Sequence, residues 1–169
     1  CIDGVFDLLE KTPVRPEDVE RIDASISKRN AIILHHHEPK TGLEAKFSLE
    51  FSVVAPIIAG RVGIAELWDD FVMRADVQAL MKRVVITLDP NEDPERAGYA
   101  MNDSVAITLK DGRRLDSGPV RAARGDHSLP LKRSELAAKF GDCLAAGGIA
   151  RGADTAFDMI MALEDVGNV

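Results

Sequence analysis

One short stretch constrains the fold more than any other: an Asp-Gly pair with an alternating segment on either side. Residues 104–109 read Ser-Val-Ala-Ile-Thr-Leu, and a second such segment covers residues 114–120. The residues between them are Lys110-Asp111-Gly112-Arg113. Asp-Gly favours a tight turn whose twist matches that of two antiparallel strands. The pattern therefore predicts an antiparallel β-hairpin.

Two further strands are expected before the hairpin. In residues 19–27, Ile22, Ala24 and Ile26 alternate with polar side chains, as in a strand with one buried face. Residues 84–88 are a short run rich in β-branched side chains. The polar segment 28–42 holds three consecutive histidines, and segment 89–102 is expected to be a loop.

Helices are expected where apolar side chains recur every three or four residues. The expected helices cover residues 2–11, 43–59 and 75–82, with a short helical turn at 63–71. In the second of them, Phe47, Phe51, Val54 and Ile58 form one stripe that should be buried.

After Gly125 the pattern is helical only. Ser134 is the expected N-cap of one helix, and Asp154 or Thr155 that of the last. The element order predicts an α+β two-layer sandwich, with a four-stranded, mostly antiparallel sheet covered by helices. We expect residues 1–125 to form this domain and residues 126–169 to be helices that belong to a second, all-helical body.

Composition excludes several classes of protein. The chain has 169 residues, a length that suits one domain or one domain plus part of another, and a net charge of −7. Its scattered basic residues argue against nucleic-acid binding, and no apolar run is long enough to span a membrane. Two cysteines without ligand spacing cannot hold an iron–sulfur cluster and suit a reducing, cytoplasmic setting.

The chain begins at Cys1 with a helix expected from residue 2, which leaves no room for an N-cap or entry loop. We expect that it was cut from a longer protein. A processed or engineered terminus is the alternative.

Three segments contain side chains that are candidates for metal binding, catalysis or substrate binding. His35 and His37 would share one face of a strand, with Glu38 beside them, but zinc catalysis needs three protein ligands, so a polar loop is favoured over a metal site. His127 lies in a Gly/Pro-bounded loop, where a lone histidine is usually just exposed.

The third segment is the start of the helix expected from residue 43. Lys46 and Ser48 have no evident packing role, and a helix N-terminus favours a carboxylate ligand. From chemistry alone, a solvated first turn with Lys46 on the surface remains the favoured interpretation.

An ordered series of short motifs runs through residues 1 to about 145. It begins with Cys1-Ile2-Asp3 and Thr41-Gly42-Leu43-Glu44-Ala45-Lys46-Phe47-Ser48-Leu49 and continues at residues 55–62, 77–84, 105–113 and 125–131. Each motif is modest alone, but the series in this order is specific. It resembles the C-terminal half of the MmgE/PrpD family.

The resemblance implies a fold and a reaction class. Family members, which include 2-methylcitrate dehydratase, cis-aconitate decarboxylase and iminodisuccinate epimerase, join a large helical domain to a smaller α+β lid. Their active site lies between the two and acts on small carboxylic acids without a metal or other cofactor. Lys46 and Ser48 are the implied substrate-binding positions. No catalytic residue is assigned, because most of them lie in the N-terminal part and in a Thr-His segment that would precede Cys1.

The expected function is therefore part of a metal-independent lyase or isomerase for a small di- or tricarboxylate. A hydro-lyase of propionate metabolism resembling 2-methylcitrate dehydratase is favoured, with the isolated chain inactive; the oligomeric state is left open. A non-catalytic binding or assembly module that keeps the lid fold is the alternative. A metal-binding regulatory domain built on the histidines is a third.

Overall fold

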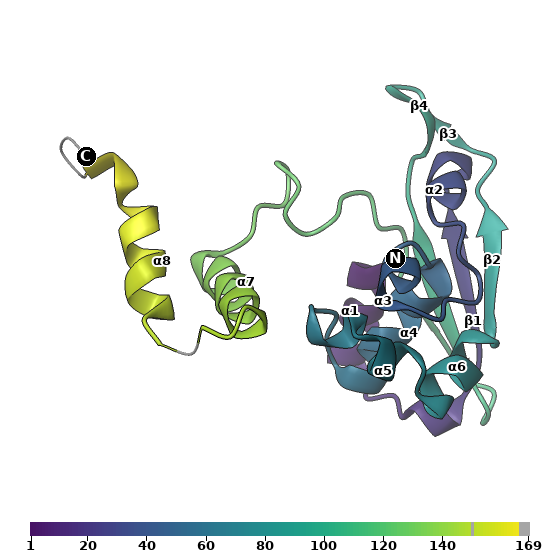
Figure 1. Ribbon diagram of the computed structural model, residues 1–169. Helices are drawn as coiled ribbons and strands as arrows, with labels where there is room; N and C mark the ends of the chain where they lie inside the picture. Colours follow the sequence, from purple (N-terminus) through teal and green to yellow (C-terminus); the bar gives the residue numbers. More distant parts are fainter. Residues whose placement is uncertain (150, 166–169) are drawn as a thin grey trace.

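The computed structural model describes residues 1–149 and 151–165, and its centre is one four-stranded sheet (Figure 1). The strand order is β2-β1-β5-β6, with β1 and β2 parallel and the other two pairs antiparallel. The strands are β1 (Val19–Ile26), β2 (Val84–Leu88), β5 (Ser104–Leu109) and β6 (Arg114–Asp116). The expected α+β class and mostly antiparallel sheet are confirmed.

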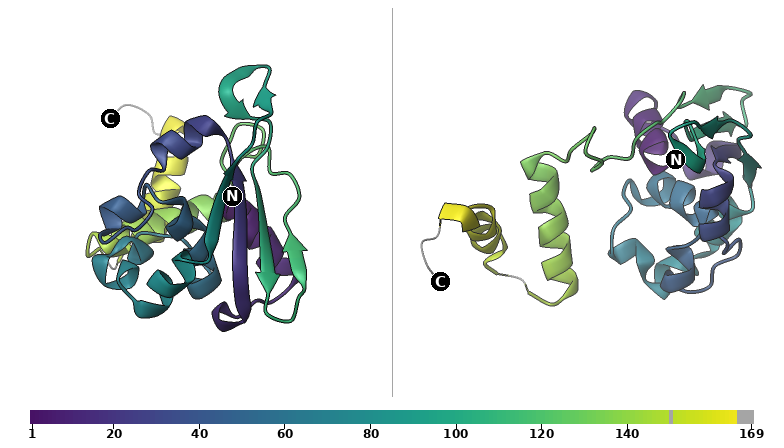
Figure 2. Two further views of the ribbon diagram at one scale, coloured as in Figure 1. Left: turned by 90° about the vertical axis from the view of Figure 1, so that its right-hand side faces the viewer. Right: turned by 90° about the horizontal axis from the view of Figure 1, so that it is seen from above.

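Helices cover one face of this sheet. In Figure 1, α1 and α4 to α6 lie on the same side of the strands, and the left view of Figure 2 has the other face toward the viewer. The helices that precede the tail are α1 (Ile2–Lys11), α2 (Lys28–Ile33), α3 (Gly42–Ala45), α4 (Leu49–Ala59), α5 (Asp69–Val72) and α6 (Ala75–Met81). Single 3-10 turns cover Pro16–Asp18 and Ala65–Leu67.

Apolar and polar side chains alternate along β1, which gives the sheet one face that packs against the helices and one polar face. Ile22, Ala24 and Ile26 point into the core, where Phe51 and Val54 of α4 are also buried. The opposite face is polar: Asp23 accepts hydrogen bonds from Arg21 (2.7 Å) and from Arg114 of β6 (3.0 Å). Successive side chains of a strand point to opposite faces, so one apolar set can be covered while the polar set meets water.

The Asp-Gly turn connects β5 and β6 as expected. Gly112 has φ of +86°, a conformation that side-chain-bearing residues rarely adopt, and the Leu109 N–H donates to the Arg113 carbonyl at 2.8 Å. Strand β6 ends at Asp116, earlier than expected, and Val120 forms a separate bridge with Asp103.

The single helix expected over residues 43–59 is wrong: the chain forms two helices, α3 and α4. Ser48 has extended backbone angles, and its hydroxyl accepts a hydrogen bond from the Phe51 N–H at 3.2 Å, so it caps a new helix. Phe47 falls in the break and is 37% exposed instead of joining the buried stripe.

Two segments expected to lack regular structure have some. Ser27 caps α2 by accepting from the Asn30 N–H at 3.1 Å. Residues 89–102 contain a small hairpin of β3 (Glu92–Asp93) and β4 (Arg96–Ala100). The Arg29 guanidinium lies 5.1 Å from the ring centre of Tyr99, which holds this hairpin against α2.

The tail consists of α7 (Arg133–Ala146), α8 (Ala153–Met161) and a 3-10 turn at Leu163–Asp165. Phe140 and Phe157 join the two helices, with ring centres 5.7 Å apart. In the described part of the tail there is no strand, in keeping with the expected boundary near Gly125, which stays a prediction.

The helix starts in the tail differ from expectation. The N-cap of α7 is Lys132, whose N–H donates to the Glu135 carboxylate at 2.7 Å, so Ser134 lies inside the first turn. Helix α8 follows Gly152 at φ of +81°, which puts Asp154 and Thr155 inside the helix. No described helix has the length and apolar character needed to cross a membrane.

Candidate functional site

The motif from Thr41 to Ser48 builds two consecutive helix starts. The Thr41 hydroxyl accepts from the Glu44 N–H at 3.3 Å and caps α3, while Ser48 caps α4. The Gly42 N–H donates to the Asp69 carboxylate at 2.7 Å, which ties α3 to α5. Much of the motif therefore has a structural purpose, and Lys46 is left exposed between the two helices.

The histidine segment lies alongside this break. His35 forms an antiparallel bridge with Ser48, and the His36 N–H donates to the Phe47 carbonyl at 3.1 Å. Two features that the sequence offered separately, the histidines and Lys46, are thus brought together. Among the described residues, none forms an ion pair with the Lys46 ammonium.

A buried carboxylate links the two segments. Glu50, in the first turn of α4, is only 7% exposed. One of its oxygens lies 2.7 Å from Nδ1 of His37, and the other accepts from the Ser48 hydroxyl at 3.1 Å. Ser48 is completely buried, so the structure places it beneath the surface that His37 and Lys46 occupy.

The other two histidines have different contacts. The rings of His35 and His36 lie 4.3 Å apart, and Nδ1 of His35 is 3.1 Å from the Ile33 carbonyl oxygen. His35 and His37 therefore do not converge with Glu38 as the metal hypothesis required. Within residues 1–149 and 151–165, no three His, Cys, Asp or Glu side chains gather in a way that could hold a metal ion.

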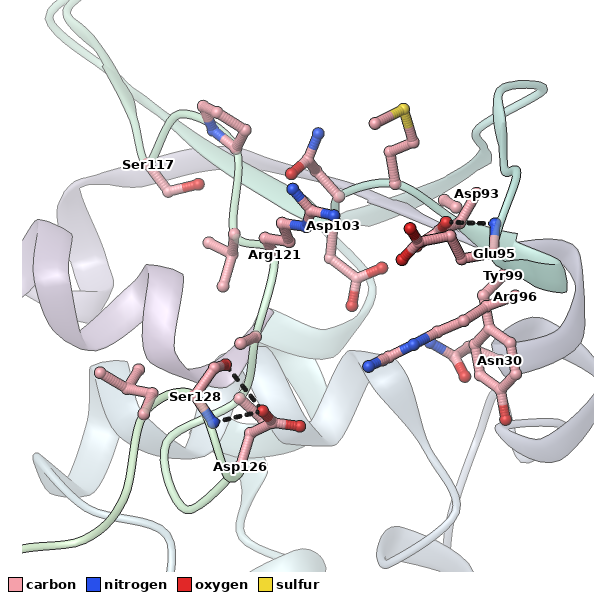
Figure 3. A pocket seen from close by; sticks show the side chains of 18 of the residues that line it. Asn30, Asp93, Glu95, Arg96, Tyr99, Asp103, Ser117, Arg121, Asp126 and Ser128 are labelled. Carbon is pink, nitrogen blue, oxygen red and sulfur yellow. Dashed lines mark hydrogen bonds between the residues drawn. The ribbon is translucent and has the colours of Figure 1, made fainter.

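A groove of about 860 Å³ lies elsewhere, between the β3–β4 hairpin and residues 117–129 (Figure 3). Arg96 and Arg121 extend into it. Five carboxyl groups also line it, those of Asp7, Asp93, Glu95, Asp103 and Asp126. With five acids against two guanidinium groups, this groove repels a di- or tricarboxylate more than it attracts one.

Two acids of this groove, Asp103 and Asp126, have shifted pKa values. Burial raises the pKa of the Asp103 carboxyl, while the amino-terminal ammonium 3.7 Å away acts in the opposite direction. The pKa of Asp126 is lowered instead, because its carboxylate accepts from the Ser128 N–H and hydroxyl. His127 beside it is 86% exposed and contacts only Asp126 among the described charged groups, at 3.0 Å.

Glu50 is the residue that reasoning from sequence missed. A signal was present, because Glu50 is the single charged residue in the otherwise apolar or small stretch Leu49–Ala59. A lone carboxylate on a buried helix requires a partner, and the partner comes from a segment thirteen residues earlier in the chain.

Comparison with known protein families decides the relationship. Residues 1–164 match the family model of the MmgE/PrpD C-terminal domain. The chain belongs to the MmgE/PrpD family. The match covers the whole sheet of this MmgE/PrpD domain and extends through α7 and α8, so the resemblance stated from the motifs is confirmed. No curated protein matches the chain.

Proposed function

We propose that this chain forms the lid part of a metal-independent lyase or isomerase acting on a small di- or tricarboxylate, most closely a hydro-lyase of the 2-methylcitrate dehydratase type. The membership in the MmgE/PrpD family supports the reaction class. The proposed location of the site rests on the antiparallel pairing of the histidine segment with residues 47–48. This pairing brings the backbone of the three histidines alongside the segment that contains Lys46.

The chemistry explains why such a surface is useful. Removing a proton next to a carboxylate creates negative charge, which nearby cations and hydrogen-bond donors stabilise. Lys46 is an exposed cation without an ion-pair partner among the described residues, so it is available to a carboxylate. Ser48 serves the same site from below, because its hydroxyl holds Glu50 in place. No residue of this chain is assigned as the base or acid.

Exposed apolar side chains around the histidines support a site that closes against another body. Ile32 and Ile33 at the end of α2 are 69% and 47% exposed, and Leu43 on α3 is 72% exposed. Phe47, in the break between α3 and α4, is a fourth exposed apolar side chain. Exposed apolar side chains that gather on one surface mark interaction sites. The same surface also supports the second candidate, a binding or assembly module without catalysis.

Lys46→Ala separates these two candidates. Turnover of 2-methylcitrate, cis-aconitate and iminodisuccinate is assayed with the chain joined to the large helical domain of an MmgE/PrpD protein, which we call the extended protein. Lys110→Ala, an exposed lysine in the β5–β6 turn, is the matched control. We expect one acid to be turned over, with a large loss of kcat/KM in Lys46→Ala and none in the control. Absence of turnover for every acid would favour the binding module.

The isolated chain should not turn over any of the three acids, because the proposed site lacks an assigned base. Clear catalysis by residues 1–169 alone would contradict this part of the proposal. Cys1 and Cys143 are free thiols, which is in keeping with the cytoplasmic location that we propose for the enzyme.

A further inference from the structure

We infer that His37 is a carboxylate-binding residue of this site, with Glu50 as the residue that positions it. This inference rests on the proposed function and names an additional contact for the substrate class. It is carried by the chain of hydrogen bonds from buried Ser48 through buried Glu50 to the exposed ring of His37.

Glu50 needs His37. A carboxylate that is 7% exposed loses most of its hydration, so it requires hydrogen-bond donors or a cation. Ser48 supplies one neutral donor at 3.1 Å. Nδ1 of His37, at 2.7 Å, is the other partner of this carboxylate among the described residues. In the tautomer with a proton on Nδ1, the ring donates to Glu50 and its orientation is fixed.

The fixed ring leaves Nε2 available. The His37 side chain is 65% exposed, and none of the described residues forms a hydrogen bond with Nε2. In the imidazolium form both nitrogens carry a proton, so His37 donates to Glu50 through Nδ1 and to a ligand carboxylate through Nε2. Glu50 offsets the positive charge of the ring, and Lys46 from the adjacent segment supplies a second contact to a polycarboxylate.

The neighbouring histidines lack this arrangement. His35 uses Nδ1 toward a backbone carbonyl, which carries no full charge. The His36 N–H donates to the Phe47 carbonyl, and the His36 ring lies 4.3 Å from that of His35 at a tilt of 36°. Only His37 combines an exposed ring with a buried carboxylate behind it, as far as the described residues extend.

The experiment is imidazole ¹⁵N NMR of the chain during titration with citrate at neutral pH. We expect the His37 ring nitrogen signals to shift as citrate binds, while those of His127 stay unchanged. His37→Gln should weaken citrate binding about tenfold or more, the loss expected for a charge-assisted hydrogen bond. His127→Gln is the matched control, since that ring is also exposed and also contacts a carboxylate.

The role of Glu50 is tested by Glu50→Leu, which removes the hydrogen-bond acceptor and fills the buried position with an apolar side chain of similar size. The His37 ring should then lose its Nδ1–H preference, a spectroscopic change that a purely structural role for Glu50 would not cause. If that variant does not fold, His37→Gln still decides the inference, because the glutamine amide can donate to Glu50 in place of Nδ1 but brings no positive charge to a ligand carboxylate.

Either of two results would overturn the inference: His37 signals that do not respond to citrate, or citrate binding that is unchanged in His37→Gln. Neither result bears on turnover by the extended protein or on its dependence on Lys46. A failure of this inference and a failure of the proposed function are therefore distinguishable.

Discussion

The carbonyl oxygen of Leu67 occupies the space in which a side chain on Gly42 would begin: a Cβ atom at residue 42 would lie 1.6 Å from it. That oxygen belongs to the backbone of the 3-10 turn Ala65–Leu67, so it cannot rotate away. The bond from the Gly42 N–H to Asp69 fixes the same approach from the other side. The glycine of the motif is therefore required for packing α3 against this turn.

Gly42→Ala should destabilise the chain by about 3 kcal/mol or more, because the backbone at Leu67 must move to admit a methyl group. Urea denaturation followed by circular dichroism measures the change. Gly141→Ala is the control: it lies within α7 with no atom near its Cβ position, so it should stabilise α7 by about 0.5–1 kcal/mol. Equal stabilities for wild type and Gly42→Ala would contradict the expected steric conflict.

Ser48→Ala should cost more than Thr41→Ala, although both remove a helix cap. Loss of a cap costs about 1 kcal/mol in each case. Ser48 also donates to buried Glu50, and a buried acceptor that loses its partner costs roughly 1–3 kcal/mol further. Thermal unfolding of the two variants gives the comparison. A Thr41→Ala variant that is the less stable of the two would show that the Ser48–Glu50 bond contributes little.

Asp103→Asn should raise stability at neutral pH and leave it unchanged near pH 3. Burial raises the folded-state pKa of Asp103 above its ordinary value of 3.8, so the native state resists deprotonation. Stability is therefore unaffected below 3.8, where both states are protonated, and falls as the pH rises through the raised folded value. The asparagine removes this penalty, a gain of roughly 0.5–2 kcal/mol.

Asp111→Asn supplies a control of opposite sign. The pKa of Asp111 is lowered, first by the hydrogen bond from the Arg113 N–H, so its charged form stabilises the fold and the variant should be less stable at neutral pH. Unfolding curves from pH 3 to pH 7 measure both effects. An Asp103→Asn variant that is less stable than wild type at pH 7 would refute the assignment.

A chain that ends at Gly125 should keep the folded sheet. The hydrophobic core around the sheet is complete at Leu109, with Leu115 packed against it, and the tail helices bury Phe157 in a contact of their own. Met159, Ile160 and other tail side chains are exposed, so the shortened chain should also associate less. Circular dichroism and light scattering test the two expectations. Complete unfolding would place the domain boundary elsewhere.

The strands and the hairpin could be predicted from sequence because their signals are local. Alternation of Ile22, Ala24 and Ile26 is visible in a short window, and so is the Asp111-Gly112 turn. The break between α3 and α4 is not local. Ser48 fits the interior of a helix as well as a cap, and the bridge to His35 is what settles the choice.

The site could be predicted only where its signals are local. The motif at residues 41–49 indicated Lys46 and Ser48, but no spacing in the sequence places His37 beside Glu50. That contact depends on how α2 ends and how the following segment returns to α4. The β3–β4 hairpin was missed because its side chains do not alternate and it is held by the contact of Tyr99 with Arg29.

The position of β1 in the sheet has a kinetic consequence. It is the first strand in the chain, yet Ile22 pairs with Val84 on one side and with Ile107 on the other. Both partners lie far along the chain from β1, so two long loops must close before β1 is paired on both sides. The entropy of closing these loops is lost before strand pairing can stabilise the sheet. Refolding should therefore be limited by closure of the sheet, well after the tail helices have formed.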